Sequence, residues 1–153
     1  MSLLTIKVFM DALGASSDVT DLVEERIWPI GVPGDDVEFL NTPLPYIVVG
    51  YSGPNNPAET KDDRWVGSND KEQIHVLFVG KNLDELADIE EKGRAAIVSY
   101  FDSLDPSDDN YALRPSNVLD PQGDMAEMNP YKPDYYHTLT YNCETDSKAG
   151  YDE

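Results

Sequence analysis

The two histidines and the single cysteine are the side chains of this sequence best suited to acid–base, metal or nucleophilic chemistry. His75 lies within the apolar stretch EQIHVLFVG, and His137 lies near the start of the alternating stretch YYHTLTYNCET. Neither histidine belongs to an HExxH motif or to another spacing typical of a metal or catalytic pair. Cys143 has no second cysteine with which to form a CxxC motif or a disulfide. We therefore interpret both histidines as structural residues and Cys143 as a small buried hydrophobic residue.

Clusters of aspartate are the next candidates, because carboxylates bind hard cations such as Ca²⁺. The stretches DPSDDN, DPQGD and ETKDD lack the alternating spacing of an EF-hand loop. The sequence has no glycine-rich phosphate loop, and GYSG lacks the GxSxG spacing of a nucleophile elbow, so we expect a turn there. The sequence therefore predicts no catalytic residues, no cofactor and no metal site, and we do not expect an enzyme.

The excess of acidic residues limits the possible partners. The chain has 30 Asp and Glu against 11 Lys and Arg, which gives a formal charge of -19. A surface that grips nucleic-acid phosphates needs clustered Lys and Arg, so we exclude binding to DNA or RNA. In the simplest interpretation, the charge keeps the protein soluble and has no further role. It could also attract a basic partner, mimic DNA, or form a wall past which DNA slides.

The length of 153 residues predicts a single domain, which we place at residues 1–146, followed by a flexible tail at 147–153. The N-terminal stretch LLTIKVFM is interrupted by Lys7 and has no basic leader, and no apolar run approaches about 18 residues. We therefore expect neither a signal peptide nor a membrane span. Because the single cysteine gives no sign of an oxidising compartment, we expect a cytoplasmic protein.

The N-terminal third predicts two helices and then two strands. Apolar residues at helical spacing predict a helix over 3–13, ended by Gly14. A second short helix should follow, with Ser17 or Asp18 as its N-cap. RIWPIGV predicts an edge strand, because Pro29 has no amide hydrogen to donate to a neighbouring strand. YIVVGY is apolar on both faces, which is typical of a central strand.

The middle of the chain predicts an interior strand and the longest helix. EQIHVLFVG is apolar at nearly every position, so both of its faces should be covered. NLDELADIEEKGRAAIVSYFDSL predicts a helix over 82–104, in which Asn82 caps and Glu85 completes a loose capping box. Gly93 permits close approach, at a cost of about 1 kcal/mol relative to Ala. The expected buried face comprises Leu83, Leu86, Ile89, Gly93, Ala96, Ile97, Tyr100, Phe101 and Leu104.

The C-terminal third changes character. Residues 105–134 hold five prolines, many acids and no period, which predicts a long acidic, proline-rich loop inserted before a last strand in YYHTLTYNCET. We assign Trp28 to the core, whereas Trp65 fits a core or an interface equally well. The expected fold class is α+β: a mostly antiparallel sheet of about four to five strands, with an N-terminal helix and one long helix packed on one face.

Three stretches, in this order, resemble a family of small phage and prophage tail-completion proteins, called tail terminators or minor tail components. They are FMDALGASSDVTDLVEERIWPIGVP, PLPYIVVGYSG and EQIHVLFVGKNLDELADIEEKGRAAIVSYFDSL, and the resemblance covers residues 8–104. In that family an N-terminal helix leads through a short segment to a proline-led strand, a hydrophobic strand and a helix. The sequence departs from the family pattern at residues 105–134, because such proteins usually close with short strands soon after the helix.

The resemblance implies a non-catalytic α+β subunit that assembles with itself into a ring, typically a hexamer, at the head-proximal end of the tail tube. Such a ring stops tube polymerisation and presents a surface to the head connector. The tail tube protein and head connector proteins are then the expected partners, and DNA passes the ring without being bound. No membrane is involved. The implied location is the cytoplasm of the bacterial host during assembly and the virion tail afterwards.

Within that interpretation we predict ring contacts around PGDD, in SGPNNPAETKDD and in residues 105–134. We also predict a channel lined by carboxylates that repel DNA phosphates. The candidate interface residues are Trp65, Asp62, Asp63, Arg64, Asp35 and Asp36. The candidate lumen residues are Asp62, Asp63, Asp108 and Asp109.

A small acidic inhibitor or DNA mimic is the alternative, since the same charge could fill a basic cleft. That alternative predicts a tight complex with one basic protein. The phage interpretation predicts self-association and binding to the ends of tail tubes.

Overall fold

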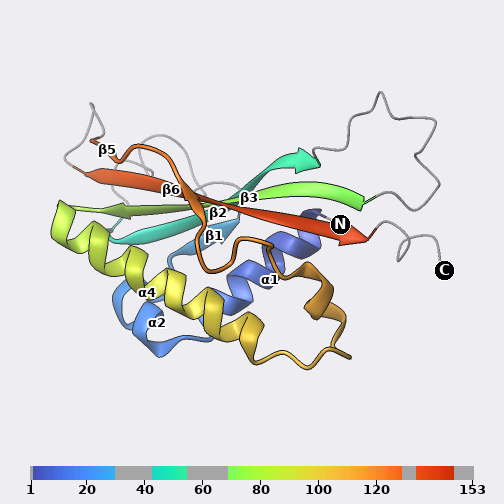
Figure 1. Ribbon diagram of the computed structural model, residues 1–153. Coiled ribbons are helices and arrows are strands. Elements are labelled where there is room, and N and C mark those ends of the chain that lie inside the picture. Colours follow the sequence, from blue (N-terminus) through green and yellow to red (C-terminus); the bar gives the residue numbers. More distant parts are fainter. Residues whose placement is uncertain (1, 30–42, 55–68, 129–133, 147–153) are drawn as a thin grey trace.

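A mostly antiparallel sheet with helices on one of its faces forms the framework of the protein (Figure 1). The computed structural model describes residues 2–29, 43–54, 69–128 and 134–146. The helices are α1 (Ser2–Gly14), α2 (Ser17–Val23), α4 (Leu83–Asp102) and the short 3-10 helix η2 (Asp109–Leu113). The strands are β1 (Ile27–Pro29), β2 (Tyr46–Pro54), β3 (Asn69–Gly80), β4 (Gln122–Gly123), β5 (Glu127–Met128) and β6 (Tyr135–Asp146). The predicted α+β fold is confirmed.

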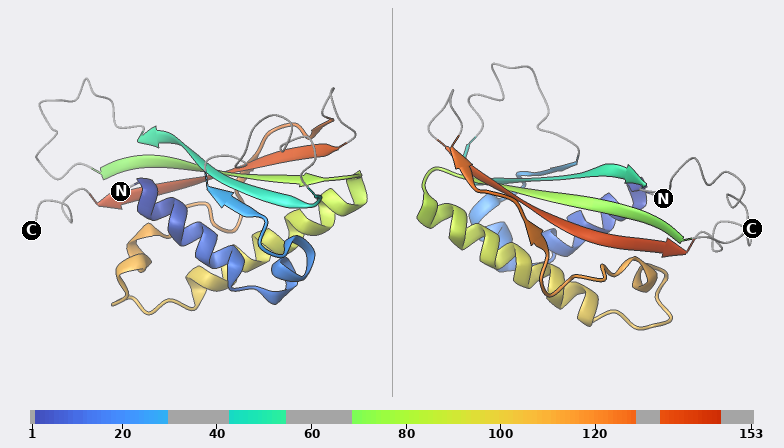
Figure 2. Two further views of the ribbon diagram at one scale, coloured as in Figure 1. Left: turned by 180° about the vertical axis from the view of Figure 1, so that it is seen from behind. Right: turned by 45° about the horizontal axis from the view of Figure 1, so that its top comes forward.

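The order of the strands places the predicted edge and interior strands where the sequence indicated. The order is β1-β2-β3-β6-β4, and β5 also pairs with β6. The β1–β2 pair is parallel, whereas the other described pairs are antiparallel. Strand β1, which ends at Pro29, lies at an edge, and β2 and β3 are interior, so these predictions are confirmed. Figure 2 shows β2, β3 and β6 running side by side.

Two local predictions are wrong. The expected turn at GYSG, residues 50–53, is part of β2, whose register is irregular between Tyr51 and Pro54. The long partner β3 continues the pairing through these breaker residues, because cross-strand hydrogen bonds override local turn preference. The N-cap of α2 is Ser16, and not Ser17 or Asp18; its side chain makes no capping hydrogen bond, while its carbonyl accepts from Thr20 N at 3.0 Å.

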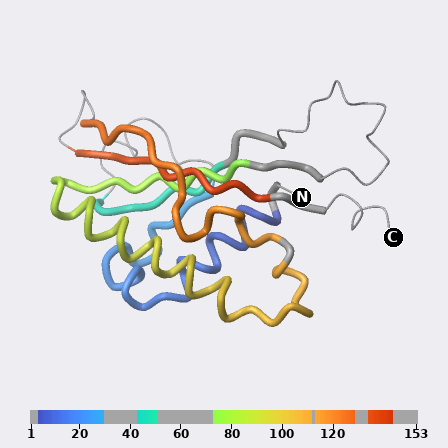
Figure 3. The backbone as a smooth tube through the Cα atoms, viewed as in Figure 1, coloured from blue at the N-terminus to red at the C-terminus, as the bar shows by residue number. Residues whose placement is uncertain are grey.

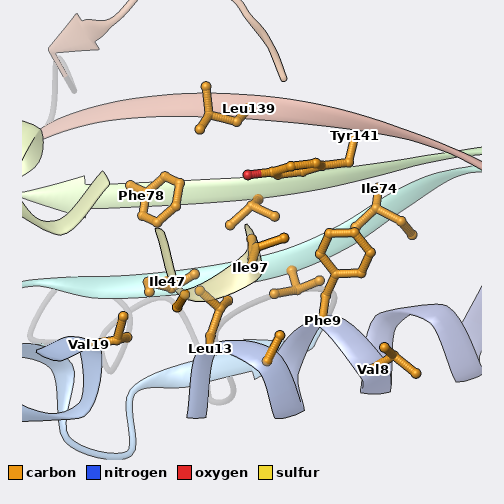
Figure 4. Close-up of a cluster of buried hydrophobic side chains, with 14 of the residues drawn as sticks. Val8, Phe9, Leu13, Val19, Ile47, Ile74, Phe78, Ile97, Leu139 and Tyr141 are labelled. Atoms are coloured by element: carbon orange, nitrogen blue, oxygen red, sulfur yellow. The ribbon is translucent and has the colours of Figure 1, made fainter. Parts of the chain in front are cut away.

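The main core lies between the sheet and the helices (Figure 4). Side chains alternate along β3, so Ile74, Val76 and Phe78 are fully buried against the helices. Strand β6 contributes Tyr141 and Cys143 to the same layer, which confirms Cys143 as a buried hydrophobic residue. The ring of Phe9 on α1 lies 5.3 Å from the ring of Tyr141, centroid to centroid, so the first helix and the last strand meet in this core.

The long helix α4 begins as the sequence predicted. Asn82 Oδ1 accepts from Glu85 N at 2.8 Å, and Glu85 Oε1 accepts from Lys81 N at 2.9 Å, so the loose capping box is confirmed. Leu83 was expected on the buried face but is 58% exposed. The packed face starts at Leu86, because the chain reverses directly after β3 and brings Gly80 against the backbone of Leu86.

Gly93 provides the close approach that the sequence indicated. A Cβ atom at this position would lie 2.5 Å from Cε1 and 2.8 Å from Cζ of Phe78, so only glycine fits without displacing that ring. The ring of Phe78 therefore packs directly against the backbone of α4.

The segment between α4 and β6, expected as a long loop, is attached to the sheet over its described part. Figure 3 shows it passing from the end of α4 to the edge of β6, and it contains η2, β4 and β5. The side chain of Asn117 makes two hydrogen bonds to the backbone of β6, as a neighbouring strand would. Its Nδ2 donates to Thr140 O at 3.1 Å, and its Oδ1 accepts from Asn142 N at 2.8 Å. Leu113 and Val118 are buried in the main core. The sequence of this segment has no periodic pattern that would predict these contacts.

We predict that Gly93→Ala lowers the free energy of unfolding by about 1–2 kcal/mol, because overpacking against Phe78 exceeds the gain of about 1 kcal/mol in helix propensity. Gly14→Ala is the matched control, since a Cβ atom there meets nothing within 4 Å. Chemical denaturation of both variants measures the difference. A Gly93→Ala protein as stable as Gly14→Ala would contradict the packing account.

Candidate functional site

The six candidate interface residues all lie outside the described residues. Asp35 and Asp36 belong to residues 30–42, and Asp62, Asp63, Arg64 and Trp65 belong to residues 55–68. The interface therefore stays a prediction. Of the four candidate lumen residues only Asp108 and Asp109 are described, so whether the four gather on one surface is also a prediction.

Asp108 and Asp109 lie at the start of η2 and are exposed. The Oδ1 atom of Asp108 accepts from Asn110 N at 2.8 Å and caps η2. Nearby, Asp105 Oδ1 accepts from Ser107 N at 2.9 Å and from Ser107 Oγ at 2.8 Å. These two hydrogen bonds lower the pKa of the Asp105 carboxyl. The segment therefore presents carboxyl groups to solvent, and local hydrogen bonds fix the side chains of Asp105 and Asp108.

Several basic side chains of the described chain are engaged within the protein. Arg114 pairs with Asp102 at 2.9 Å, and Lys92 pairs with Asp88 at 3.2 Å. Arg26 pairs with Glu24 at 3.7 Å and donates to Pro45 O at 3.0 Å. Because these cations already pair with neighbouring groups, the remaining carboxylates give the surrounding surface a negative charge.

His137 joins three elements of the fold. Its Nδ1 atom contacts Glu90 Oε1 on α4, and its Nε2 atom lies 2.6 Å from the backbone oxygen of Asp124, between β4 and β5. Gly123 lies close to the ring, since a Cβ atom there would lie 3.1 Å from Nε2. This arrangement fits the structural role that the sequence predicted, but nothing in the sequence pointed to Glu90 or Asp124 as partners.

The partners of His137 favour its charged form. A carboxylate and a carbonyl oxygen only accept hydrogen bonds, and a neutral imidazole has only one N–H to donate. Burial alone lowers the pKa of His137, but the hydrogen bonds to Glu90 and to the Asp124 backbone, with the charges of both carboxylates, outweigh it and raise the pKa. Because both ring nitrogens are occupied, the cluster is arranged to hold elements together and not to accept a proton from a substrate.

His75 is also held by a neighbour on the sheet. Its Nδ1 atom lies 3.0 Å from Thr140 Oγ1 on the adjacent strand β6. Within the ranges that the structure describes, no group of three or more His, Cys, Asp or Glu could hold a metal ion.

The face of the sheet opposite the helices carries a second, smaller apolar cluster. Tyr46, Val48 and Val79 are buried there, and Trp28 packs against Tyr46 with ring centroids 5.5 Å apart. Trp28 is only half-buried, so its place is this cluster and not the main core. Burial, followed by the charge of Asp134, raises the pKa of Tyr46 to about 12. The apolar character of both faces of β2 and β3, read from the sequence, accounts for this cluster.

A hollow of about 500 Å³ lies between α4 and the segment that leads to β4. Its walls include Ala87 and Val98 of α4 and the exposed Leu119, with Glu90, Glu91 and Arg94 among its polar residues. The guanidinium of Arg94 donates to Leu119 O at 3.4 Å and thereby ties the segment to the helix. The lining of the hollow is therefore a mixture of small apolar and charged side chains.

Comparison with known proteins finds matches among solved structures alone. No protein-family model and no curated protein matches the chain. Among solved structures, it is similar to a chain of the virion of a native gene transfer agent particle, with 10% identity and a TM-score of 0.48 over 92% of this chain and 93% of that chain. A likeness at this level carries no argument about function. No helix of the described chain is long and apolar enough to span a membrane.

We predict that an NMR titration places the pKa of His137 above 6.5, and that Glu90→Gln lowers it, because the glutamine keeps an acceptor but loses the charge. With the pKa raised in the folded state, the stabilisation is complete below about pH 6.5 and is lost as the pH rises through the folded pKa.

The free energy of unfolding should therefore differ between wild type and Glu90→Gln by about 1–2 kcal/mol at pH 5.5 and by less at pH 9. Asp88→Asn serves as a control, since it removes from α4 an exposed carboxylate that pairs with Lys92. A difference that grows with pH would contradict the assignment.

Proposed function

We propose that the protein is a structural component of a tailed phage or prophage virion, and that it closes the tail tube as a tail terminator or head–tail joining ring. One observation carries the proposal: the three stretches that resemble tail-completion proteins form the kinds of helix and strand that the family pattern implies for them. The first gives the C-terminal part of α1, then α2 and the edge strand β1, the second gives the interior strand β2, and the third gives most of β3 and all of α4.

A closed ring needs two different surfaces on each subunit, which meet head to tail. We place them in residues 30–42 and 55–68, which follow β1 and β2 and hold Asp35, Asp36, Asp62, Asp63, Arg64 and Trp65. A tryptophan beside an arginine is a composition that interface centres favour. The ring would be a hexamer, with the tail tube protein on one side and the head connector proteins on the other.

The acidity of the chain supports the proposal that the ring encloses a channel through which DNA passes without binding. A net charge of -19 repels phosphates, and Asp108 and Asp109 are exposed and ionisable at the start of η2. We propose that these two residues, with Asp62 and Asp63, line the lumen. Assembly would take place in the cytoplasm of the bacterial host, and the finished ring would lie in the virion tail. The protein would have no catalytic role.

The engaged basic side chains favour one alternative, an acidic inhibitor or DNA mimic. Pairs such as Arg114–Asp102 and Lys92–Asp88 leave a surface dominated by carboxylates, which would complement a basic cleft. This function predicts a tight complex with a single basic protein. It predicts no effect on tail length.

Particles assembled without this protein provide the decisive test. We predict that electron microscopy shows overlong or headless tails, because nothing stops tube polymerisation or offers a surface to the head. Restoring the gene in trans should restore tails of normal length. Unaltered tails would remove the terminator role and favour the inhibitor alternative.

The lumen assignment has its own test. We predict that Asp62→Asn, Asp63→Asn, Asp108→Asn and Asp109→Asn together slow DNA ejection several-fold, because fewer charges then repel the phosphates. Asparagine at 108 keeps the oxygen that caps η2, so the fold should be unchanged. The control is the pair Asp18→Asn and Asp21→Asn, which neutralises exposed residues of α2. Particles of the fourfold variant that eject DNA like the control would count against a lumen lining.

A further inference from the structure

On the side opposite β1, the sheet ends in two short and exposed strands, β4 and β5. Strands β4 and β5 lie one after the other along β6, with Gly123 opposite Leu139 and Met128 opposite Tyr135. All seven residues from 122 to 128 are exposed. The outer side of such a strand presents backbone donors and acceptors on which another strand can pair. We call residues 119–128 the β4–β5 edge.

The β4–β5 edge is held in place by the strand behind it. Asp124 N donates to Thr138 O at 3.3 Å, and Thr138 N donates to Asp124 Oδ1 at 3.3 Å. His137 binds the backbone oxygen of Asp124 and lies against Gly123. These contacts fix the edge in an extended shape before any partner arrives, which reduces the ordering cost of binding.

The β4–β5 edge also carries the three most exposed large apolar side chains among the described residues. Met125 is 80% exposed, Leu119 is 69% exposed and Met128 is 59% exposed. Met128 pairs with Tyr135, which packs on the main core, so both lie on the helix side of the sheet. The hollow between Leu119 and α4 lies on the same side. Residues 122–128 contain no Lys or Pro, two residue types that often protect an edge strand, and their protection is limited to the shortness of β4 and β5 and to the charges of Asp124 and Glu127.

The negative charge of the β4–β5 edge favours a basic partner. The edge contains Asp120, Asp124 and Glu127 and no Lys or Arg, and the adjoining hollow is lined by Glu90 and Glu91 with one cation, Arg94. A second copy of this chain would bring the same carboxylates and a net charge of -19. A basic segment would neutralise them, so complementarity favours a different protein over self-pairing.

We propose that the β4–β5 edge and the hollow beside α4 form a docking site for an extended, basic and amphipathic segment of a partner protein, which adds a strand to the sheet. Backbone hydrogen bonds to the edge hold the segment, and alternate side chains of one face reach Met128, Leu119 and the hollow. Basic side chains of the segment meet Asp120 and Glu127. The flexible methionines adapt to apolar side chains of different shapes. This site stands independently of the tail function proposed above.

A synthetic ten-residue peptide that alternates Lys and Val is the probe. We expect NMR spectra of the full chain to show amide shifts concentrated at residues 119–128 and 135–140, with a dissociation constant on the order of 10–100 μM. The double substitution Met125→Glu and Met128→Glu should weaken binding at least tenfold. It adds two negative charges, so an attraction that was merely electrostatic would become stronger.

Two controls complete the design. Leu4→Glu on α1 replaces a 45% exposed apolar residue far from the edge in sequence and should leave binding unchanged. A Lys–Val peptide with N-methyl groups on alternate residues cannot donate along its edge and should not bind. The proposal is overturned if the probe does not bind, if the shifts map elsewhere on the acidic surface, or if the methionine variant binds as well as wild type.

Discussion

The contact between Gly93 of α4 and the ring of Phe78 on β3 sets how closely the helices lie on the sheet. A Cβ atom at position 93 would lie 2.5 Å from the Phe78 ring and 3.5 Å from Leu13 of α1, so two helices and a central strand meet at this point. One turn earlier on α4, Glu90 reaches His137. Further along, Phe101 packs edge-on against Phe9 with centroids 5.6 Å apart. A wider spacing would separate all of these pairs.

Strand β6 is the second organising element, because it connects the core to the rest of the C-terminal third. One of its edges pairs with β3 along its whole length, and the other receives β4, β5 and the side chain of Asn117. His137 lies on this strand and links it to both α4 and the β4–β5 edge. His137 and Glu90 therefore fasten these segments to one another.

The surfaces divide into regions of different chemistry. The helix α4 carries several carboxylates, of which Asp88 and Asp102 pair with Lys92 and Arg114. The sheet has a short parallel edge at β1 and an exposed, methionine-bearing edge at β4 and β5. A subunit that joins a ring and also meets proteins above and below it requires several such non-equivalent contact surfaces. The proposed ring contacts and the proposed strand-addition site occupy different parts of the chain.

The sequence by itself determined the elements whose signal is carried by their own residues. Helical spacing predicted α1 and α4, Asn82 and Glu85 predicted where α4 begins, and Pro29 predicted an edge strand. Apolar character on both faces predicted that β2 and β3 are interior. These predictions succeeded because periodicity, capping and the missing proline amide act within a few residues.

Tertiary structure alone decided the rest. GYSG became strand because the distant β3 pairs with it, and Asn117 holds its segment to β6 through hydrogen bonds to Thr140 and Asn142. Glu90, His137 and Asp124 come together from three elements, and the exposed β4–β5 edge exists only because β6 positions it. These features rest on hydrogen bonds between residues far apart in the chain, whose partners no local pattern specifies.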